Sequence, residues 1–405
     1  MTLRGTTKNA KSAKARGATP PVPSAPSRTD AGKVRLGELL TETITGEWGC
    51  ESSPSNGVAV LRTTNFTNGG EINYDNLAWR EVAQDKVDRK HLCVGDIVVE
   101  KSGGTKDHPV GRVVFFDRDD GVYLCNNFTQ ILRPDRSLIV PRFLFYTLRA
   151  KYEMRATESM YNKTTGIQNL KMSLYMAMSI PLPPLPAQRR IADELDQLCA
   201  LKKNAEDRLA ILDQIVKSRF VEMFGDVEEG SAKFQVVHLI DVCTSMSAGK
   251  DVPEDYVKVK DSLHQVPIYS NGVENDGLYG YASEPRIFEP SLTISGRGTI
   301  GYVCRREVPF VPIIRLIVAT PNKDIVDLVF LQWALKDRCA KNTGTTIPQL
   351  PVPAAKSIKV ILPPLALQRE FAAFVTEVDK SKLTLRETVA TLDQLYRAKL
   401  QEYFG

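Results

Sequence analysis

Residues 183–225 read PPLPAQRRIADELDQLCALKKNAEDRLAILDQIVKSRFVEMFG, and residues 363–405 read PPLALQREFAAFVTEVDKSKLTLRETVATLDQLYRAKLQEYFG. The two segments align without a gap at an offset of 180 residues, and 14 of their 43 positions are identical. Self-similarity of this kind indicates an internal repeat. It divides the chain into a globular segment, a helix, a second globular segment and a second helix.

Both copies have the hydrophobic period of a long helix with one narrow apolar seam, because apolar residues recur at alternating steps of four and three. The first seam consists of Ile191, Leu195, Leu198, Ala205, Leu209, Leu212, Val216 and Met223. The second consists of Phe371, Val375, Val378, Leu385, Val389, Leu392, Tyr396 and Tyr403. Lys202 and Lys382 occupy the same seam position in the two copies, where a lysine can snorkel or set the register.

A double proline lies just before each helix, and Gly225 ends the first one as a C-terminal glycine does. A helix from Ala187 to Phe224 has 38 residues and should be roughly 57 Å long. Such a seam needs a partner, and the other copy in the same chain is the nearest one. The alternative is that each helix packs only on the domain that precedes it.

The segments before the helices have the pattern of strands and hairpins, since β-branched runs alternate with Asn-Gly and Gly-Gly turns. The runs start at Gly57, Val94 and Val110 in the first segment and at Val266, Glu289 and Phe310 in the second. Helix-like stretches follow at 143–148 and 329–335, and then TTGIQNL and GTTIPQL, again 180 residues apart. The Gly-rich run SGRGTIG at 295–301 fits a tight hairpin turn as well as it fits an anion-binding loop.

These patterns predict an α+β protein in which two strand-rich α/β globular domains are separated by two long paired helices, with a pseudo-twofold internal repeat. The expected boundaries are a basic tail at 1–32, domains at 33–185 and 226–365, and helices at 186–225 and 366–405.

The composition of the chain is that of an ordinary globular protein, with 405 residues, 42% hydrophobic and 25% charged. Residues 1–32 hold six basic residues and one acidic residue, so this tail accounts for the whole formal net charge of +5. Having almost no large apolar side chains, the tail is expected to be disordered. We interpret the tail as an inert extension in preference to a DNA-contacting arm. An organelle transit peptide is the least favoured of the three interpretations.

Several classes of site lack their residues in this sequence. No apolar run approaches the ~18–20 residues of a membrane span. The seven cysteines are scattered without a CxxC pair and only four histidines are present, so we expect no metal site, no disulfide framework and reduced thiols in a cytoplasmic protein. Phosphate-loop, dinucleotide, HExxH, GxSxG and amino-methyltransferase motifs are absent, so an enzyme is disfavoured and no cofactor is expected.

A pseudo-twofold chain with two unlike domains suits a ligand with two sites at a defined separation, and duplex DNA is the commonest such ligand. The duplicated Pro-Pro-Leu-x-x-Gln-Arg unit with its helix, together with Gly95-Asp96-Ile97-Val98-Val99 and Lys101-Ser102-Gly103, resembles the specificity subunits of type I restriction-modification systems. The resemblance covers residues 33–405.

This resemblance implies two target-recognition domains that each read one half of a bipartite site in double-stranded DNA. It also implies that the helices form an antiparallel coiled coil on which two adenine methyltransferase subunits dock, and that restriction subunits, ATP-driven translocases and endonucleases, can join. The chain itself would be non-catalytic and act in phage defence. Two departures from the family pattern are the tail and the insertion Lys106-Asp107-His108, which is either a DNA-contacting or a solvated loop.

Donor chemistry on loops beside the predicted sheets selects the candidate DNA-binding residues, because Arg and Lys bind guanine edges or phosphates while Asn and Gln suit adenine. In the first domain they are Arg62, Thr64, Asn65, Lys101, Ser102, Lys106, Lys163, Thr164 and Gln168. In the second they are Tyr269, Ser270, Asn271, Arg297, Thr299, Arg315, Thr345 and Gln349. Each of them can equally be a solvated or capping polar side chain.

Two functions outside this interpretation remain open from the sequence. The first is a coiled-coil scaffold that organises proteins and never touches DNA. The second is a DNA-binding protein with two reading domains and no methyltransferase partner. The DNA target and the spacer length cannot be read from the residues, because recognition loops have no simple residue-to-base code.

Overall fold

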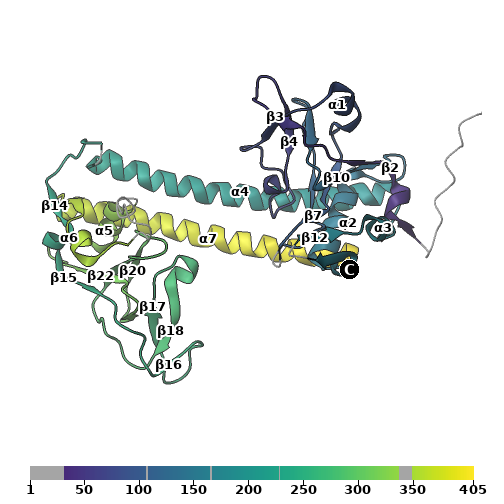
Figure 1. Ribbon diagram of the computed structural model, residues 1–405. Coiled ribbons are helices and arrows are strands. Elements are labelled where there is room, and N and C mark those ends of the chain that lie inside the picture. The colour runs from purple at the N-terminus through teal and green to yellow at the C-terminus, as the bar shows by residue number, and fades with distance from the viewer. Residues whose placement is uncertain (1–31, 106–107, 165–166, 228, 337–348) are drawn as a thin grey trace, which may run out of the picture. The chain divides into compact units, whose positions relative to one another are not determined.

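The computed structural model describes residues 32–105, 108–164, 167–227, 229–336 and 349–405 (Figure 1). The chain forms two compact units, each described here by itself. One comprises Met1–Cys199 with Gln394–Gly405, and the other comprises Ala200–Asp393. Each unit therefore holds one strand-rich domain and a part of both long helices.

The strands of the first domain form four small sheets. The first two are β1 (Lys33–Arg35) with β13 (Ser179–Pro181), and β2 (Leu40–Thr45), β10 (Thr129–Pro134), β6 (Ile97–Glu100) and β8 (Val113–Phe115) in that order. The others are β3 (Cys50–Glu51), β5 (Ala78–Glu81), β4 (Val58–Leu61) and β9 (Tyr123–Cys125), and β11 (Tyr161–Thr164), β12 (Ile167–Leu170) and β7 (Ser102–Gly103). The helices are α1 (Gln84–Lys90), α2 (Pro141–Glu153) and α3 (Met172–Met176).

The core of the first domain lies between its two four-stranded sheets. Leu61 and Cys125 from one sheet and Val98 and Ile131 from the other belong to one buried cluster. The Val-rich runs of the sequence are thus strands covered on both faces, since all four residues of β6 and three of the four in β4 are buried.

The second domain repeats three of these four sheets, and its described residues hold no counterpart of the β11-β12-β7 sheet. It has β14 (Val236–His238) with β23 (Lys359–Ile361), then β15 (Cys243–Ala248), β22 (Ile317–Pro321), β19 (Ser291–Ile294) and β20 (Val303–Arg306), and finally β16 (Tyr256–Val257), β18 (Leu278–Ala282), β17 (Val266–Tyr269) and β21 (Val311–Pro312). Its short helices are α5 (Leu328–Leu335) and α6 (Val352–Lys356). Parallel pairing of β4 with β9 recurs as parallel pairing of β17 with β21.

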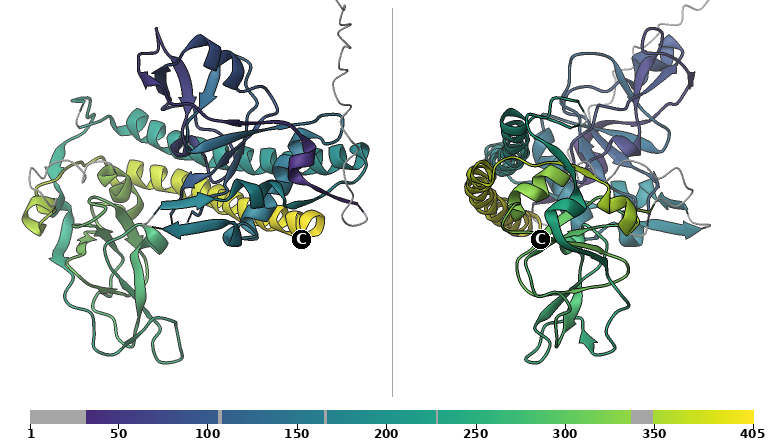
Figure 2. Two further views of the ribbon diagram at one scale, coloured as in Figure 1. Left: turned by 45° about the vertical axis from the view of Figure 1, so that its right-hand side comes forward. Right: turned by 90° about the vertical axis from the view of Figure 1, so that its left-hand side faces the viewer.

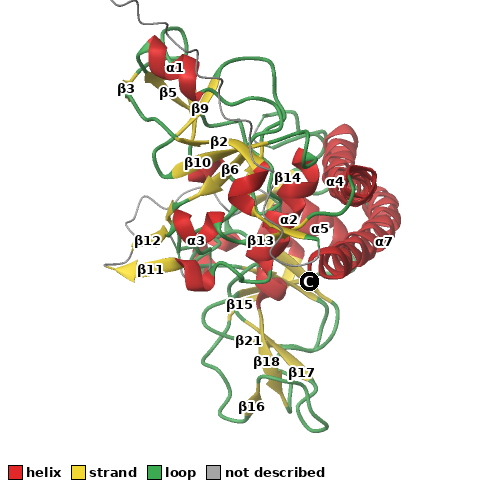
Figure 3. Cartoon of the chain, turned by 90° about the vertical axis from the view of Figure 1, so that its right-hand side faces the viewer, coloured by secondary structure: helices red, strands yellow, loops and turns green. Residues whose placement is uncertain are grey.

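The repeat therefore extends from the helices, where the sequence reveals it, into the domains, where sequence identity is low. Strands predominate in both domains (Figure 3). The helix-like stretches at 143–148 and 329–335 lie in α2 and α5, as predicted. SGRGTIG forms the connection of the β19–β20 hairpin, and the run from Phe310 is divided between β21 and β22, which belong to different sheets.

The two long helices are α4 (Leu185–Phe224) and α7 (Leu365–Phe404), each 40 residues long. They begin directly after the double prolines and are about 60 Å long at the usual rise per residue. Gly225 follows α4 with φ +77°, and its N–H donates to the carbonyl of Val221. An added Cβ would lie 2.0 Å from the Ser231 carbonyl oxygen, so glycine is needed at this position.

The helices pair with each other in antiparallel orientation (Figure 2). In the second unit Lys202 Nζ lies 2.7 Å from Asp393 Oδ1, and Lys382 Nζ lies 2.7 Å from Asp213 Oδ1. The two ion pairs are one pair repeated at the offset of 180 residues. In the first unit Glu194, near the start of α4, bonds Lys399 at 3.1 Å near the end of α7. The alternative in which each helix packs only on its preceding domain is wrong.

All the predicted seam residues are shielded, to different degrees. Nine of them are buried, namely Ile191, Leu195, Leu198, Ala205, Val216, Phe371, Val375, Val378 and Tyr396. The other seven are half-buried, namely Leu209, Leu212, Met223, Leu385, Val389, Leu392 and Tyr403. Phe220 and Phe224, which lie outside the predicted seam, also pack in the pair: their rings lie 5.4 and 5.6 Å from the ring of Phe371.

A buried glutamine fastens each domain to the helix that follows it. Gln188 Oε1 accepts from the Val140 N–H at 2.8 Å, and its Nε2 donates to the carbonyls of Leu138 and Pro183. Gln368 does the same with the Asp327 N–H and the carbonyls of Ile325 and Pro363. Because both amides are almost fully buried and fully bonded, the glutamine of Pro-Pro-Leu-x-x-Gln-Arg acts as a joint between domain and helix.

The two lysine–aspartate pairs differ in burial, which predicts unequal effects on stability. Asp213→Ala leaves the buried Lys382 ammonium without this partner and should lower the free energy of unfolding by about 1–3 kcal/mol. Asp393→Ala removes the equivalent partner of the half-buried Lys202 and should cost about 0–1 kcal/mol. Denaturant unfolding of both variants checks this, and equal losses would contradict it.

Candidate nucleic-acid interface

Three loops of the second domain meet at the side chain of Asn271, which follows β17. Its Oδ1 accepts from the Gly296 N–H at 2.8 Å in the β19–β20 loop, and its Nδ2 donates to the Ile314 carbonyl at 2.7 Å in the β21–β22 loop. The amide therefore places the predicted site residues Arg297 and Arg315 on neighbouring loops. Both polar ends of Asn271 are thus used to hold the loops together, and its contact with a base stays a prediction.

Arg297 and Arg315 have different surroundings. Arg297 is half-buried, its Nη2 lies 3.4 Å from Gln349 Oε1, and the Leu350 N–H donates to the Gly296 carbonyl. Arg315 is exposed and has φ +59°, and Ile314 before it has φ +51°. Each residue costs about 1–2 kcal/mol in this left-handed conformation. Such strain persists where the surroundings impose it, often at a ligand contact.

The strained turn is held by the end of β15. The Ile314 N–H donates to the Lys250 carbonyl at 2.9 Å, and the Arg315 N–H donates to the Gly249 carbonyl at 3.1 Å. Lys250 is exposed beside this turn and was missed by the sequence analysis. Thr299 is also exposed, in the β19–β20 loop, and Ser270 is half-buried.

Tyr269 has a role inside the domain. Its ring lies 5.8 Å from the ring of Phe310, and the guanidinium carbon of Arg306 lies 3.6 Å from its centroid. Arg306 is buried and donates to Thr293 Oγ1 and to the Asp276 carbonyl. One face of the Tyr269 ring is thus covered by this cation, and a DNA contact of Tyr269 stays a prediction.

Asn65, after β4 in the first domain, is likewise internal. It is buried, its Oδ1 accepts from the Arg62 N–H at 2.9 Å, and its Nδ2 donates to the carbonyls of Asn73 and Asn76. The Arg62 guanidinium also donates to the Asn76 carbonyl, at 2.7 Å, whereas Thr64 is exposed. The Asn65 amide therefore closes this turn, and its contact with DNA stays a prediction.

The β7–β12 pair of the first domain carries two of the predicted site residues, Ser102 and Gln168. Gln168 is buried, its Oε1 accepts from the Val110 N–H, and its Nε2 donates to the Thr105 carbonyl, both at 3.1 Å. Ser102 Oγ donates to Asn169 Oδ1 at 2.6 Å. Gln168 therefore links Thr105 to Val110 inside the domain, and its contact with DNA stays a prediction.

Lys101 is a half-buried cation between β6 and β7. Within the described ranges no carboxylate forms an ion pair with it, and burial lowers the pKa of its ammonium group. A half-buried ammonium without a carboxylate is suited to receive a phosphate or a base edge. Lys163 and Thr164 lie in β11 opposite Gln168 and Ile167. Lys106 and Thr345 fall outside the described residues.

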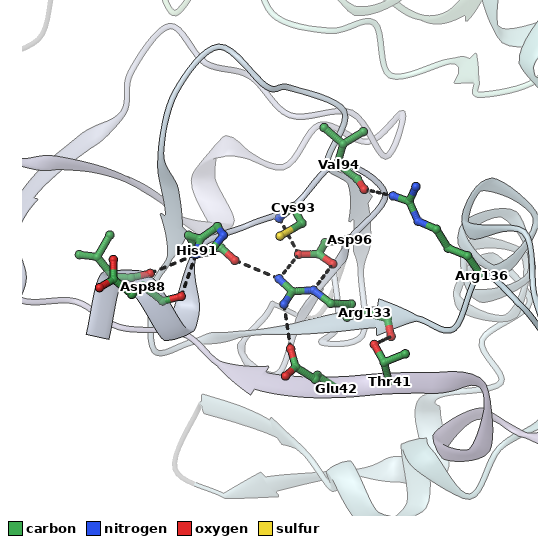
Figure 4. Close-up of polar contacts among 10 residues, drawn as sticks. Thr41, Glu42, Asp88, His91, Cys93, Val94, Asp96, Arg133 and Arg136 are labelled. Carbon is green, nitrogen blue, oxygen red and sulfur yellow. Dashed lines mark hydrogen bonds and ion pairs between the residues drawn. The ribbon is translucent and has the colours of Figure 1, made fainter. Parts of the chain in front are cut away.

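Asp96, in the Gly-Asp-Ile-Val-Val motif, is a structural residue (Figure 4). Its buried carboxylate accepts from Arg133 Nε at 3.0 Å, from Arg133 Nη2 at 2.9 Å and from the Cys93 N–H at 2.8 Å. Arg133 also bonds Glu42, and its bonds to Asp96 raise the pKa of its guanidinium group. The cluster joins β2, β6 and β10, so this motif stabilises the sheet beneath the loops.

Comparison with known proteins agrees with this frame. The family model described as the type I restriction modification DNA specificity domain matches residues 31–211 and 232–394. The chain belongs to the type I restriction-modification specificity family. The two matches correspond to the two halves of the repeat.

Two relatives of this specificity-family chain are Mycoplasma pneumoniae proteins named as type I specificity subunits. One is 27% identical over 266 residues, which cover 64% of this chain and 70% of that protein. The other is 26% identical over 295 residues, which cover 70% and 86%. A crystal structure of the S subunit of a type I restriction-modification system from M. genitalium has the same fold, with a TM-score of 0.59 at 17% identity over 94% of this chain and 99% of that one.

Two further findings concern the described part of this specificity-family chain. None of its helices is both long enough and apolar enough to cross a membrane. No group of three or more His, Cys, Asp and Glu side chains is arranged to hold a metal ion among the described residues.

Proposed function

We propose that this chain reads an asymmetric two-part site in double-stranded DNA, with one half of the site bound by each strand-rich domain. The observation that carries the proposal is a strand frame repeated in both domains beneath polar loops that differ. Lys101 and Ser102 stand after β6, whereas Arg297 and Thr299 stand after β19. Because the frames match and the side chains do not, the two half-sites should differ in sequence.

We assign DNA methylation and cleavage to partner subunits rather than to this chain. Two adenine methyltransferase subunits would dock on the paired helices, and restriction subunits would join that complex for ATP-driven cleavage. Support comes from an exposed apolar face on α4, where Leu201, Ile211 and Ile215 lie within one 100° stripe of the helix. Leu395 on α7 is exposed at the position equivalent to Ile215. Exposed apolar stripes of this kind mark protein interfaces.

Mapping methylated adenines in the host genome with and without this gene tests DNA recognition. The expected result is the loss of one split motif with a fixed spacer when the gene is deleted. A genome whose methylation is unchanged would contradict the proposal and favour a scaffold that does not bind DNA.

If methyltransferase subunits dock on this apolar face, substitutions in it should remove them one at a time. Ile215 is 44% exposed and Leu395 is 43% exposed, so aspartate at either position should leave each helix folded but charge its apolar face. Ile215→Asp and Leu395→Asp should each reduce the complex from two methyltransferase subunits to one, and the double variant to none. Light scattering of the purified complex measures the mass.

The matched control for docking is Gln214→Asp with Gln394→Asp, since these exposed residues are also equivalent and lie next to the apolar positions. This control should retain two methyltransferase subunits. If the complex of the control variant loses as much mass as the complexes of the Ile215 and Leu395 variants, docking through this face is contradicted.

A further inference from the structure

An exposed aromatic ring stands on a rigid turn of the first domain. Phe128, between β9 and β10, is 49% exposed. The turn is closed by Thr129, whose N–H and Oγ donate to the Asn126 carbonyl at 3.0 and 2.8 Å. The Phe128 carbonyl accepts from the N–H groups of Lys101 at 2.9 Å and Ser102 at 3.1 Å. The ring is therefore held beside two residues proposed to contact DNA.

The second domain has an exposed apolar side chain at the equivalent turn, between β21 and β22. Ile314 is 47% exposed, and its φ of +51° is a rare conformation for a β-branched residue. Its carbonyl accepts from Asn271, its N–H donates to Lys250, and Arg315 follows it. The backbone is thus strained at the residue whose side chain is held outward.

Single exposed apolar residues are common and carry no meaning by themselves. Here the exposure recurs at the same point of a repeated frame, each time after the parallel strand pair and each time next to a cation or amide of the proposed interface. Proteins that kink DNA use apolar side chains such as Phe and Ile, placed near Lys or Arg, to enter between base pairs and unstack them.

We propose that Phe128 and Ile314 are wedge residues that insert between neighbouring base pairs, one in each half of the DNA site. This proposal rests on the proposed function and deepens it. Opening a base step lowers the cost of extruding a nucleotide, which a methyltransferase needs in order to reach an adenine within a duplex. The wedge would thus prepare the half-site for a reaction that another subunit carries out.

The test uses the full chain in complex with its methyltransferase and a duplex that carries the mapped motif. 2-Aminopurine, whose fluorescence rises when it is unstacked, is placed in turn at each step of both half-sites. The complex should raise the fluorescence at one step in each half. Phe128→Ala should abolish the rise in one half and Ile314→Ala in the other, and each should weaken binding at matched salt by about tenfold.

Phe128→Trp keeps a large ring on the turn and should retain both signals, which separates insertion from a loss of fold. Matched controls are Val122→Ala and Phe288→Ala, because these side chains are 54% and 69% exposed before β9 and before β19, at the ends of those strands away from the loops. Both controls should behave as the unaltered chain.

Three outcomes would overturn the wedge. If the unaltered complex binds the motif specifically but Phe128→Ala changes neither fluorescence nor affinity, the wedge is wrong while two-part recognition stands. If Phe128→Ala instead releases the methyltransferase, the ring is a protein contact. If the unaltered complex shows no specific binding, both the proposed function and the wedge are contradicted.

Discussion

Phe371→Ala is expected to lower the free energy of unfolding of the second unit by about 3–5 kcal/mol, the usual cost of truncating a fully buried phenylalanine. Phe371 is 0% exposed. Its ring contacts the rings of Phe220 and Phe224 from α4 and lies 6.4 Å from the ring of Trp333 in α5. The cavity left by Phe371→Ala would therefore weaken the packing of α4, α7 and the second domain at once.

Trp333 gives a direct measurement of this loss. The chain has three tryptophans, and Trp48 and Trp79 belong to the first unit. In a background with phenylalanine at those two positions, the emission of Trp333 reports denaturant unfolding of the second unit alone. Phe288→Ala is the matched control, since this phenylalanine is exposed in the same unit, and it should change stability by no more than about 0.5 kcal/mol. Similar losses for both variants would contradict a core shared by the two helices and the domain.

Replacing both Arg297 and Arg315 with alanine is expected to reduce affinity for the mapped duplex by about 2–4 kcal/mol, roughly thirty- to a thousandfold. The physical reason is that Asn271 holds both loops at one end of the second domain, so two cations act on one half-site. Loss of two positive charges should also make binding less dependent on salt. Discrimination should relax in one half of the motif only.

Equilibrium titrations at several salt concentrations measure both effects. Lys323→Ala is the control, because Lys323 is an exposed cation of the same domain that follows β22, and β22 runs antiparallel to β19, which Arg297 follows. This control should bind as the unaltered chain does. If the double variant kept its affinity and Lys323→Ala lost affinity, the DNA-reading end would lie at the opposite end of the strands.

The long helices and their pairing were predictable because their signal is local and periodic. A seam spaced by three and four residues specifies which face is shielded, and the same lysine in both copies indicated a polar seam position. The prediction did not extend to the aspartate partners of Lys202 and Lys382, nor to Phe220 and Phe224. All four lie off the strict seam: Phe220 and Phe224 pack into the core of the second domain, whereas Asp213 and Asp393 form ion pairs between the two helices.

The candidate DNA contacts were less predictable, because residue type does not reveal whether a polar group is already bonded. Asn65, Gln168 and Asn271 have the side chains that suit adenine, yet their amides hold loops through bonds to backbone groups 3 to 63 residues away. Lys250 and Phe128 were missed, since neither belongs to a motif. They stand out only by their exposure next to the other loops.

By itself the sequence determined the repeat, the two helices with their shielded faces and the strand-rich character of both domains, because these follow from patterns along a few turns or one strand. Tertiary structure decided which loops meet, which polar groups remain free and where the run from Phe310 breaks between two sheets. These outcomes depend on hydrogen bonds and packing between residues far apart in the chain, and no local pattern encodes such partners.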